Sequence, residues 1–111
     1  MLSLLKLKLL IPQFKTTIII NKKKLDKELF EKAIEISLEL GITNFQFGDG
    51  FGATISNEDV VEILRFLGNH NSIKIVGGIK KLSHVVDLFD LGIDCIGTSS
   101  FNNIFKEIKL F

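Results

Sequence analysis

Two segments in the second half of the sequence carry residue types that can bind a phosphate group. Residues 73–79 read Ile-Lys-Ile-Val-Gly-Gly-Ile, and residues 92–101 read Gly-Ile-Asp-Cys-Ile-Gly-Thr-Ser-Ser-Phe. Each is a short apolar run that ends in small residues, which leave backbone N–H groups open to a phosphate oxygen. Lys74 adds an amine in the middle of the first run. A lysine beside a phosphate pocket is typical of sugar-phosphate chemistry.

Alternating strands and helices must position these residues. Runs of β-branched residues predict strands, and apolar side chains spaced three and four residues apart predict helices. The predicted strands cover residues 15–21, 43–47, 72–76 and 94–98, and the predicted helices cover 26–40, a segment capped by Ser56 that runs to Leu67, 82–91 and 102–110. This order predicts an α/β fold of four parallel βα units. We assign residues 1–111 to a single domain, with a basic, leucine-rich extension over residues 1–14 and the βα units over residues 15–111.

Two of the helices carry clear local signals. Ser56 followed by Asp59 three residues later is the pattern of a capping box at a helix start. The helix over 26–40 ends at Gly41, a common terminating residue. Its helically spaced residues, almost all of them apolar, are Leu29, Phe30, Ala33, Ile34, Ser37 and Leu38.

Four short motifs in residues 15–101 resemble the carboxyl-terminal half of the deoxyribose-phosphate aldolases, which are (β/α)₈-barrel enzymes. The family's Gly-Ala-Asp-Phe-(Ile/Val)-Lys-Thr-Ser-Thr-Gly-Phe corresponds to residues 41–51, in an eroded form. Its Gly-Ala-Thr and Glu-Asp-Val correspond to residues 52–54 and 58–60. Its Lys-x-x-Gly-Gly-Ile and Ile-Gly-Thr-Ser-Ser correspond to residues 74–79 and 96–100. The resemblance implies that this chain forms half of a TIM barrel.

The same resemblance implies that the chain has lost a central catalytic group. In the family, the lysine of the Lys-Thr-Ser-Thr-Gly motif forms a Schiff base with the aldehyde substrate. Gln46 stands at that position, and a carboxamide cannot act as the amine nucleophile. Lys74 corresponds to a second family lysine, which assists the first by the proximity of like charge. The family's acidic proton shuttle lies in the half of the barrel that the resemblance does not cover.

The phosphate-binding elements of the family are better preserved than its catalytic lysine. Asp49 departs from them, because it stands where the family has a threonine and its charge would repel a phosphate unless it points away. Ordinary strand-end turns are the alternative interpretation of the glycine motifs. The resemblance assigns phosphate binding to Gly77, Gly78, Gly97, Ser99 and Ser100.

The alternation of side chains along the strands places two of these candidates together. Phe45 and Phe47 share one face of their strand, so Gln46 lies on the other face, and Lys74 likewise lies opposite its isoleucine neighbours. In a barrel the apolar faces meet the helices, so Gln46 and Lys74 point inward on neighbouring strands. There Lys74 can donate a hydrogen bond to the amide oxygen of Gln46. The alternative is an edge lysine whose ammonium group reaches water.

These observations leave three functional hypotheses. The first is a deoxyribose-phosphate-aldolase-like protein without Schiff-base activity that retains binding of a small phosphorylated sugar. The second is an active class I aldolase that cleaves 2-deoxyribose 5-phosphate to glyceraldehyde 3-phosphate and acetaldehyde, with the amine of Lys74 or with groups from a partner chain. The third is a protein-interaction module that uses its open strand edges or its basic amino-terminal segment.

The predicted fold cannot close on itself. A barrel of this type has eight strands, so four strands leave two open edges and one uncovered sheet face. We therefore predict that the chain is not a monomer: either two copies complete a barrel or another polypeptide supplies the second half. The leucine-rich start is a further candidate to cover the open face. A decayed gene product that folds poorly is the remaining alternative.

Composition argues against several other classes of function. Cys95 is the single cysteine, and His70 and His84 lack metal-ligand spacing, so we predict no disulfide, no metal and no cofactor. Residues 1–24 hold six lysines and no acidic residue, a bias that can attract nucleic acid or anionic membranes. Three of these lysines form a run before a helix, as on a solvated surface, so we predict neither partner. The apolar start is too short and too charged to span a bilayer, and we predict a cytoplasmic protein.

Overall fold

A computed structural model describes residues 16–22, 25–48, 55–68 and 71–109. Strands and helices alternate through these residues as predicted, and the element ends differ from the predicted ones by at most two residues where the structure describes them. The extension over residues 1–14 lies outside the described part. The elements are β1 (Thr17–Ile20), α2 (Lys27–Glu39), β2 (Asn44–Phe47), α3 (Asn57–Leu67), β3 (Ser72–Val76), α4 (Leu82–Leu91), β4 (Cys95–Gly97) and α5 (Phe101–Lys109).

The four strands form one parallel sheet in the order β1-β2-β3-β4. Each strand therefore lies beside the strand that follows it in the sequence, as in one half of a (β/α)₈ barrel. Ile19, Gln46, Lys74 and Cys95 are register partners across the four strands. The predicted neighbours Gln46 and Lys74 are thus adjacent on the sheet.

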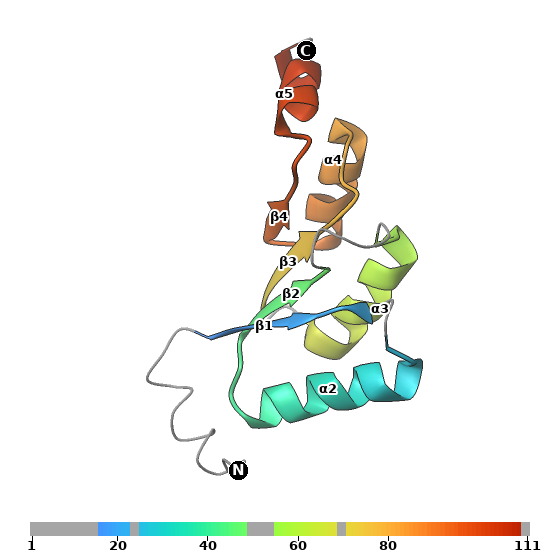
Figure 1. Ribbon diagram of the computed structural model, residues 1–111, viewed down its shortest axis with the longest axis vertical. Coiled ribbons are helices and arrows are strands. Elements are labelled where there is room, and N and C mark those ends of the chain that lie inside the picture. The colour runs from blue at the N-terminus through green and yellow to red at the C-terminus, as the bar shows by residue number, and fades with distance from the viewer. Residues whose placement is uncertain (1–15, 23–24, 49–54, 69–70, 110–111) are drawn as a thin grey trace.

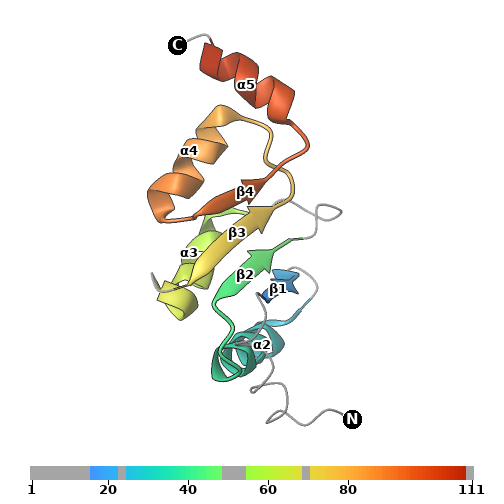
Figure 2. The ribbon, with the colours of Figure 1, turned by 90° about the vertical axis from the view of Figure 1, so that its left-hand side faces the viewer.

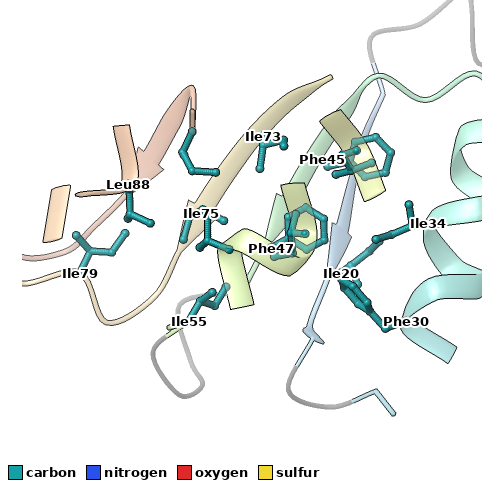
Figure 3. Close-up of a cluster of buried hydrophobic side chains, with 14 of the residues drawn as sticks. Ile20, Phe30, Ile34, Phe45, Phe47, Ile55, Ile73, Ile75, Ile79 and Leu88 are labelled. Atoms are coloured by element: carbon teal, nitrogen blue, oxygen red, sulfur yellow. The ribbon is translucent and has the colours of Figure 1, made fainter. Parts of the chain in front are cut away.

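The hydrophobic core lies between the sheet and the helices on one of its faces (Figures 1 and 2). Alternate residues of β2 and β3 point into it, and Phe47 packs against the rings of Phe30 and Phe45 with centroids 6.0 and 6.3 Å apart. The intervening residues of these strands point to the opposite face, which no described helix covers. Figure 3 shows the core residues Ile20, Phe30, Ile34, Phe45, Phe47, Ile55, Ile73, Ile75, Ile79 and Leu88.

Side chains satisfy the free N–H groups at three helix starts. Asp26 accepts a hydrogen bond from the backbone of Leu29 at the start of α2. The predicted capping box at α3 is confirmed, because Ser56 and Asp59 each accept from the backbone N–H of the other. At α4 the N-cap side chain makes no such bond. Instead a carboxylate from α5, that of Glu107, accepts from the backbone N–H of Leu82 at 2.6 Å and joins the last two helices.

An ion-pair cluster joins the end of β1 to α3. Lys22 Nζ lies 3.1 Å from a carboxylate oxygen of both Asp59 and Glu62, and 5.4 Å from the ring centroid of Phe30. Burial by itself lowers the pKa of Lys22, but its hydrogen bonds to Glu62 and Asp59 outweigh burial and raise the pKa above 10.5. Burial likewise acts to raise the pKa of Asp59, yet the bonds from Lys22 and Ser56 bring it below 3.8.

This cluster predicts two pH-dependent losses of stability. The lowered pKa of Asp59 stabilises the fold above the unfolded-state pKa, and this contribution disappears as the pH falls below about 4. The raised pKa of Lys22 stabilises the fold below its unfolded-state pKa, and this contribution disappears as the pH rises above about 10.5. We expect Lys22→Met to lower the free energy of unfolding at neutral pH by about 1–2 kcal/mol and to flatten both losses. Urea denaturation across pH measures this.

Lys27→Met is the matched control, because Lys27 is an exposed lysine at the start of α2. It removes the same charge without touching the ion pair. Identical pH profiles for the two variants would contradict the assigned role of Lys22.

Candidate functional site

A cavity of about 350 Å³ lies at the carboxyl ends of β2, β3 and β4. This is the end of a parallel sheet at which barrel enzymes bind their substrates. All seven residues that the sequence analysis singled out for catalysis or phosphate binding line it, although they come from three strands and two loops. The lining residues are Gln46, Lys74, Val76, Gly77, Gly78, Ile79, Lys80, Gly97, Thr98, Ser99 and Ser100.

The hydrogen bond that strand alternation allowed between Lys74 and Gln46 does not form among the described residues. The Nε2 group of Gln46 instead donates to the backbone carbonyl of Gly48 at 3.0 Å. Gly48 ends the strand with a φ of +89°, which leaves its carbonyl oxygen within reach of the amide two residues earlier. Lys74 makes no hydrogen bond to Gln46 in the described residues. Its aliphatic stem passes over Gly97, where a Cβ atom would lie 3.3 Å from Lys74 Cε.

The loop after β3 lines the cavity with two adjacent glycines. Gly77 and Gly78 have φ angles of +112° and +70°, which glycine adopts without the strain that a Cβ atom brings. Among the described loop residues, neither N–H group donates to a backbone carbonyl. These two groups are therefore available to an anion in the cavity.

Thr98 holds the two cavity loops together, a role that the sequence analysis did not assign. Its Oγ1 donates to the carbonyl oxygen of Ile79 at 2.6 Å and accepts from the backbone N–H of Ser100 at 3.0 Å. The first bond fixes the loop after β3 and the second fixes the loop before α5. The Gly-Thr-Ser-Ser motif contains this threonine, but its partner lies 19 residues away.

The charge of the cavity favours an anion. Lys74 and Lys80 both line it, and no acidic side chain of the described residues does. The amino terminus of α5 follows Ser100 directly, and the first turn of a helix carries a partial positive charge. Lys80 is a second residue that the sequence analysis missed, although it follows the Gly-Gly-Ile motif at once. Asp49, whose charge we expected to disfavour a phosphate, lies outside the described residues.

Further properties of the described residues concern other kinds of site. No group of three histidine, cysteine, aspartate or glutamate side chains among them is arranged to hold a metal ion. Cys95 is exposed. None of the helices in the described segments has the length and apolar character that a bilayer crossing requires. A larger hollow of about 600 Å³ lies over the outer surfaces of α2 and α3, but it is lined by residues of both charges and by none of the predicted candidates.

Comparisons with known proteins support the motif assignment. The chain is 34% identical to a deoxyribose-phosphate aldolase from Thermococcus kodakarensis over 90 residues, and 30% identical to one from Gloeobacter violaceus over 73 residues. Among solved structures, the aldolase QR15 superimposes with a TM-score of 0.78 at 28% identity. This chain resembles the deoxyribose-phosphate aldolases. A candidate deoxyribose-phosphate aldolase from Coccidioides immitis superimposes with a TM-score of 0.74 at 16% identity, which supports the fold. No protein-family model matches the sequence.

The extent of these matches confirms the predicted half barrel. Alignment covers 78% and 66% of this chain but only 39% and 32% of the two aldolase sequences. The QR15 superposition covers 96% of this chain and 50% of that structure. The chain therefore spans half or less of the aldolases it matches, and its four parallel βα units correspond to half of an aldolase barrel.

Proposed function

We propose that the cavity binds the phosphate group of a small phosphorylated sugar, and that this chain alone does not carry out Schiff-base aldolase chemistry. One observation carries the proposal. Residues chosen from separate sequence motifs converge on a single cavity at the carboxyl ends of three strands. Parallel strands bring any strand-end residues to one edge of the sheet, but the residues gathered here also suit an anion, because the cavity is lined by two lysines, Lys74 and Lys80, and by no acidic side chain of the described residues.

Backbone groups and lysines together suit a phosphate. Gly77 and Gly78, whose N–H groups donate to no backbone carbonyl of the described residues, line the cavity from one loop, and Ser99 and Ser100 line it from the other. A phosphate oxygen accepts hydrogen bonds from such donors, and these bonds are strengthened by its charge. Lys74 lies on β3, the strand that leads into the first of these loops, and adds a charge opposite to that of the phosphate. A neutral ligand would use fewer of these groups.

The amine required for covalent aldolase chemistry is missing at the position of Gln46. Schiff-base formation begins when an uncharged amine attacks the carbonyl carbon, and it ends with loss of water. The amide nitrogen of Gln46 shares its lone pair with its own carbonyl group. It is also engaged as a donor to Gly48. Gln46 therefore forms part of a polar wall of the cavity and does not act as a nucleophile.

The second candidate function is an aldolase that uses the amine of Lys74. Its supporting observation is that Lys74 lines the cavity on the strand next to Gln46 and in register with it. Only the active aldolase would form a covalent adduct between Lys74 and the sugar. Incubation with deoxyribose 5-phosphate and a hydride reductant, followed by intact mass spectrometry, tests for that product. We expect no sugar adduct, and an adduct mapped to Lys74 would favour the active aldolase.

Phosphate binding has its own test in a matched pair of variants at Thr98. Thr98→Val removes both hydrogen bonds that hold the cavity loops, whereas Thr98→Ser keeps a hydroxyl at the same place. We expect the valine variant to bind deoxyribose 5-phosphate about tenfold more weakly, the effect of losing about 1.4 kcal/mol, and the serine variant to bind like the unchanged chain. Isothermal titration calorimetry measures both affinities.

Unphosphorylated deoxyribose and inorganic phosphate complete the design of this experiment. Inorganic phosphate should bind and compete with the sugar phosphate, and deoxyribose should not bind measurably. Equal binding of deoxyribose and its phosphate would show that the cavity recognises the sugar. No binding of either phosphate compound by the folded chain would overturn the proposal.

A further inference from the structure

The two outermost helices carry exposed apolar side chains on their outward flanks. Figure 1 shows α2 at one end of the helical layer and α5 at the other. Leu29 and Ile36 of α2 are 54% and 41% exposed, and Phe101 and Ile108 of α5 are 63% and 49% exposed. In both helices the pair lies seven residues apart, which is two helical turns, so each pair forms one stripe.

Each stripe lies on the side of its helix that faces away from the neighbouring helix. On α2, Phe30 contacts the ring of Phe66 on α3, and Lys27 and Glu31 border the hollow that α2 shares with α3. At 100° per residue, Leu29 lies on the flank opposite Lys27 and Glu31. The missing neighbour of α2 would therefore meet an apolar surface.

The same reasoning applies to α5 at the other end of the layer. Glu107 marks the side of α5 that contacts α4, because it accepts a hydrogen bond from Leu82. Around the axis of α5, the buried Ile104 lies between Glu107 on one side and Phe101 and Ile108 on the other. Phe105, which stacks on Phe101 at 5.7 Å, extends this stripe.

The sheet is open at the same two places. Among the described strands, β1 and β4 are the outer ones, so each offers one edge to a further strand. Ile19 of β1 is 60% exposed on the face away from the helices, and Cys95 of β4 is exposed on that same face. An apolar side chain on an uncovered sheet face is unfavourable in water.

We propose that a second copy of this chain closes the barrel, with β4 of each copy beside β1 of the other and α5 of each copy against α2 of the other. A two-fold axis along the barrel axis keeps all eight strands parallel, as a barrel requires. Two identical junctions then form at once. The helix α2 follows β1 and α5 follows β4, so the stripe of Leu29 and Ile36 in one copy faces the stripe of Phe101 and Ile108 in the other. The proposal does not depend on phosphate binding.

The exposed area matches what a stable dimer needs. The six exposed side chains on these edges are large, and at about 150–250 Å² for each fully exposed aromatic and somewhat less for each aliphatic, they leave on the order of 500 Å² of apolar surface per copy. Two copies together would bury on the order of 1,000 Å² of apolar surface from these side chains alone, which is about the lower limit for a specific interface. The six side chains are Ile19, Leu29, Ile36, Phe101, Phe105 and Ile108.

A second copy fits better than an unrelated chain because the two edges of this one chain complement each other. Each edge presents a parallel strand and an apolar helix flank, and the chain superimposes on half of an aldolase structure with 96% of its residues. A copy rotated by 180° about the barrel axis would supply the four strands of the other half. An unrelated partner would have to match both edges independently.

Charged substitutions on the two flanks test the junction itself. We expect the unchanged chain to sediment as a dimer, and Ile36→Lys or Ile108→Glu alone to raise the dimer dissociation constant by at least about tenfold. Mixing the two variants should restore dimers, because a mixed dimer has one unchanged junction and one in which the two introduced charges face each other. Val86→Lys is the control: it replaces a side chain of similar exposure (47%) on the inner helix α4 and should leave the dimer unchanged.

Sedimentation velocity over a range of concentrations measures these states, and circular dichroism confirms that each variant is folded. Cys95 provides a second readout, because barrel closure would cover the sheet face on which it lies. A thiol reagent should therefore modify Cys95 slowly in the dimer and faster in each single variant. A folded chain that stays monomeric, open-ended assemblies, or variants that dissociate but are not restored by mixing would each overturn the proposal. Loss of phosphate binding would leave it intact.

Discussion

We expect replacement of Gly48 with alanine to unfold this protein. A Cβ atom at Gly48 would lie 2.0 Å from the backbone carbonyl oxygen of Val76, far inside any van der Waals contact. The obstacle is main chain, so no side-chain rotation relieves it, and β2 would have to move away from β3. The φ of +89° at Gly48 adds backbone strain for any residue with a Cβ atom.

The size of the effect follows from the stability of small domains. Separating β2 from β3 removes packing at the centre of the sheet, and the whole fold is stable by only about 5–15 kcal/mol. We expect Gly48→Ala to show no cooperative urea transition, followed by circular dichroism, under conditions where the unchanged chain shows one. The same change would displace the carbonyl that accepts from Gln46 and so distort the cavity.

Gly41→Ala is the control that separates crowding from backbone strain. Gly41 has a similar φ of +82°, but nothing lies within 4 Å of its added Cβ position. Gly41→Ala should therefore lower the free energy of unfolding only by the strain of a left-handed residue, about 1–2 kcal/mol. It should keep a cooperative transition. Equal losses at Gly41 and Gly48 would contradict the close approach of β2 to Val76.

The order of strands and helices could be predicted from the sequence because it rests on local patterns. The helix over Leu82–Leu91 and the strand over Ser72–Val76 have the predicted bounds. The capping box at Ser56 is equally local. The cavity residues could be grouped for a different reason, because residues that follow parallel strands necessarily meet at one edge of the sheet.

Contacts between distant segments could not be predicted in the same way. The alternation of side chains placed Gln46 beside Lys74, but it did not show that the Gly48 carbonyl would hold the Gln46 amide. Thr98 is similar, since its partner at Ile79 comes from another loop. Hydrogen-bond partners depend on loop geometry of a few tenths of an ångström, and strand alternation carries no such information.

The helical pattern of α2 was also too broad to separate the core from an exposed flank. Leu29, Phe30 and Ile34 belong to one apolar series in the sequence. In the structure Phe30 and Ile34 are buried, while Leu29 is more than half exposed. A residue that belongs to an apolar series but is exposed in one copy is a candidate for burial against a second copy. The exposure of Leu29 therefore marks the outward flank of α2 as a candidate contact surface.

We expect Phe47→Ala to be the most damaging substitution of a core side chain. Phe47 has no exposed surface and packs against both Phe30 and Phe45. Truncation of a buried phenylalanine costs about 3–5 kcal/mol, from lost burial and from the cavity that remains. Urea denaturation should show a midpoint shifted far toward low denaturant, with the cavity-lining side chains untouched because they lie on the other face of β2.

Ile19→Ala is the matched change on the opposite face of the sheet. Ile19 is 60% exposed in a single copy, so its truncation should change the unfolding free energy of the monomer by no more than about 0.5 kcal/mol. In a closed barrel the same side chain would be buried, and its loss would weaken the dimer instead. Ile19→Ala should therefore lower the apparent stability mainly at protein concentrations where the unchanged chain is dimeric, and little where it is monomeric. Phe47→Ala should lower the apparent stability at every concentration. A large loss from Ile19→Ala in the isolated monomer would mean that this face is already covered within one copy.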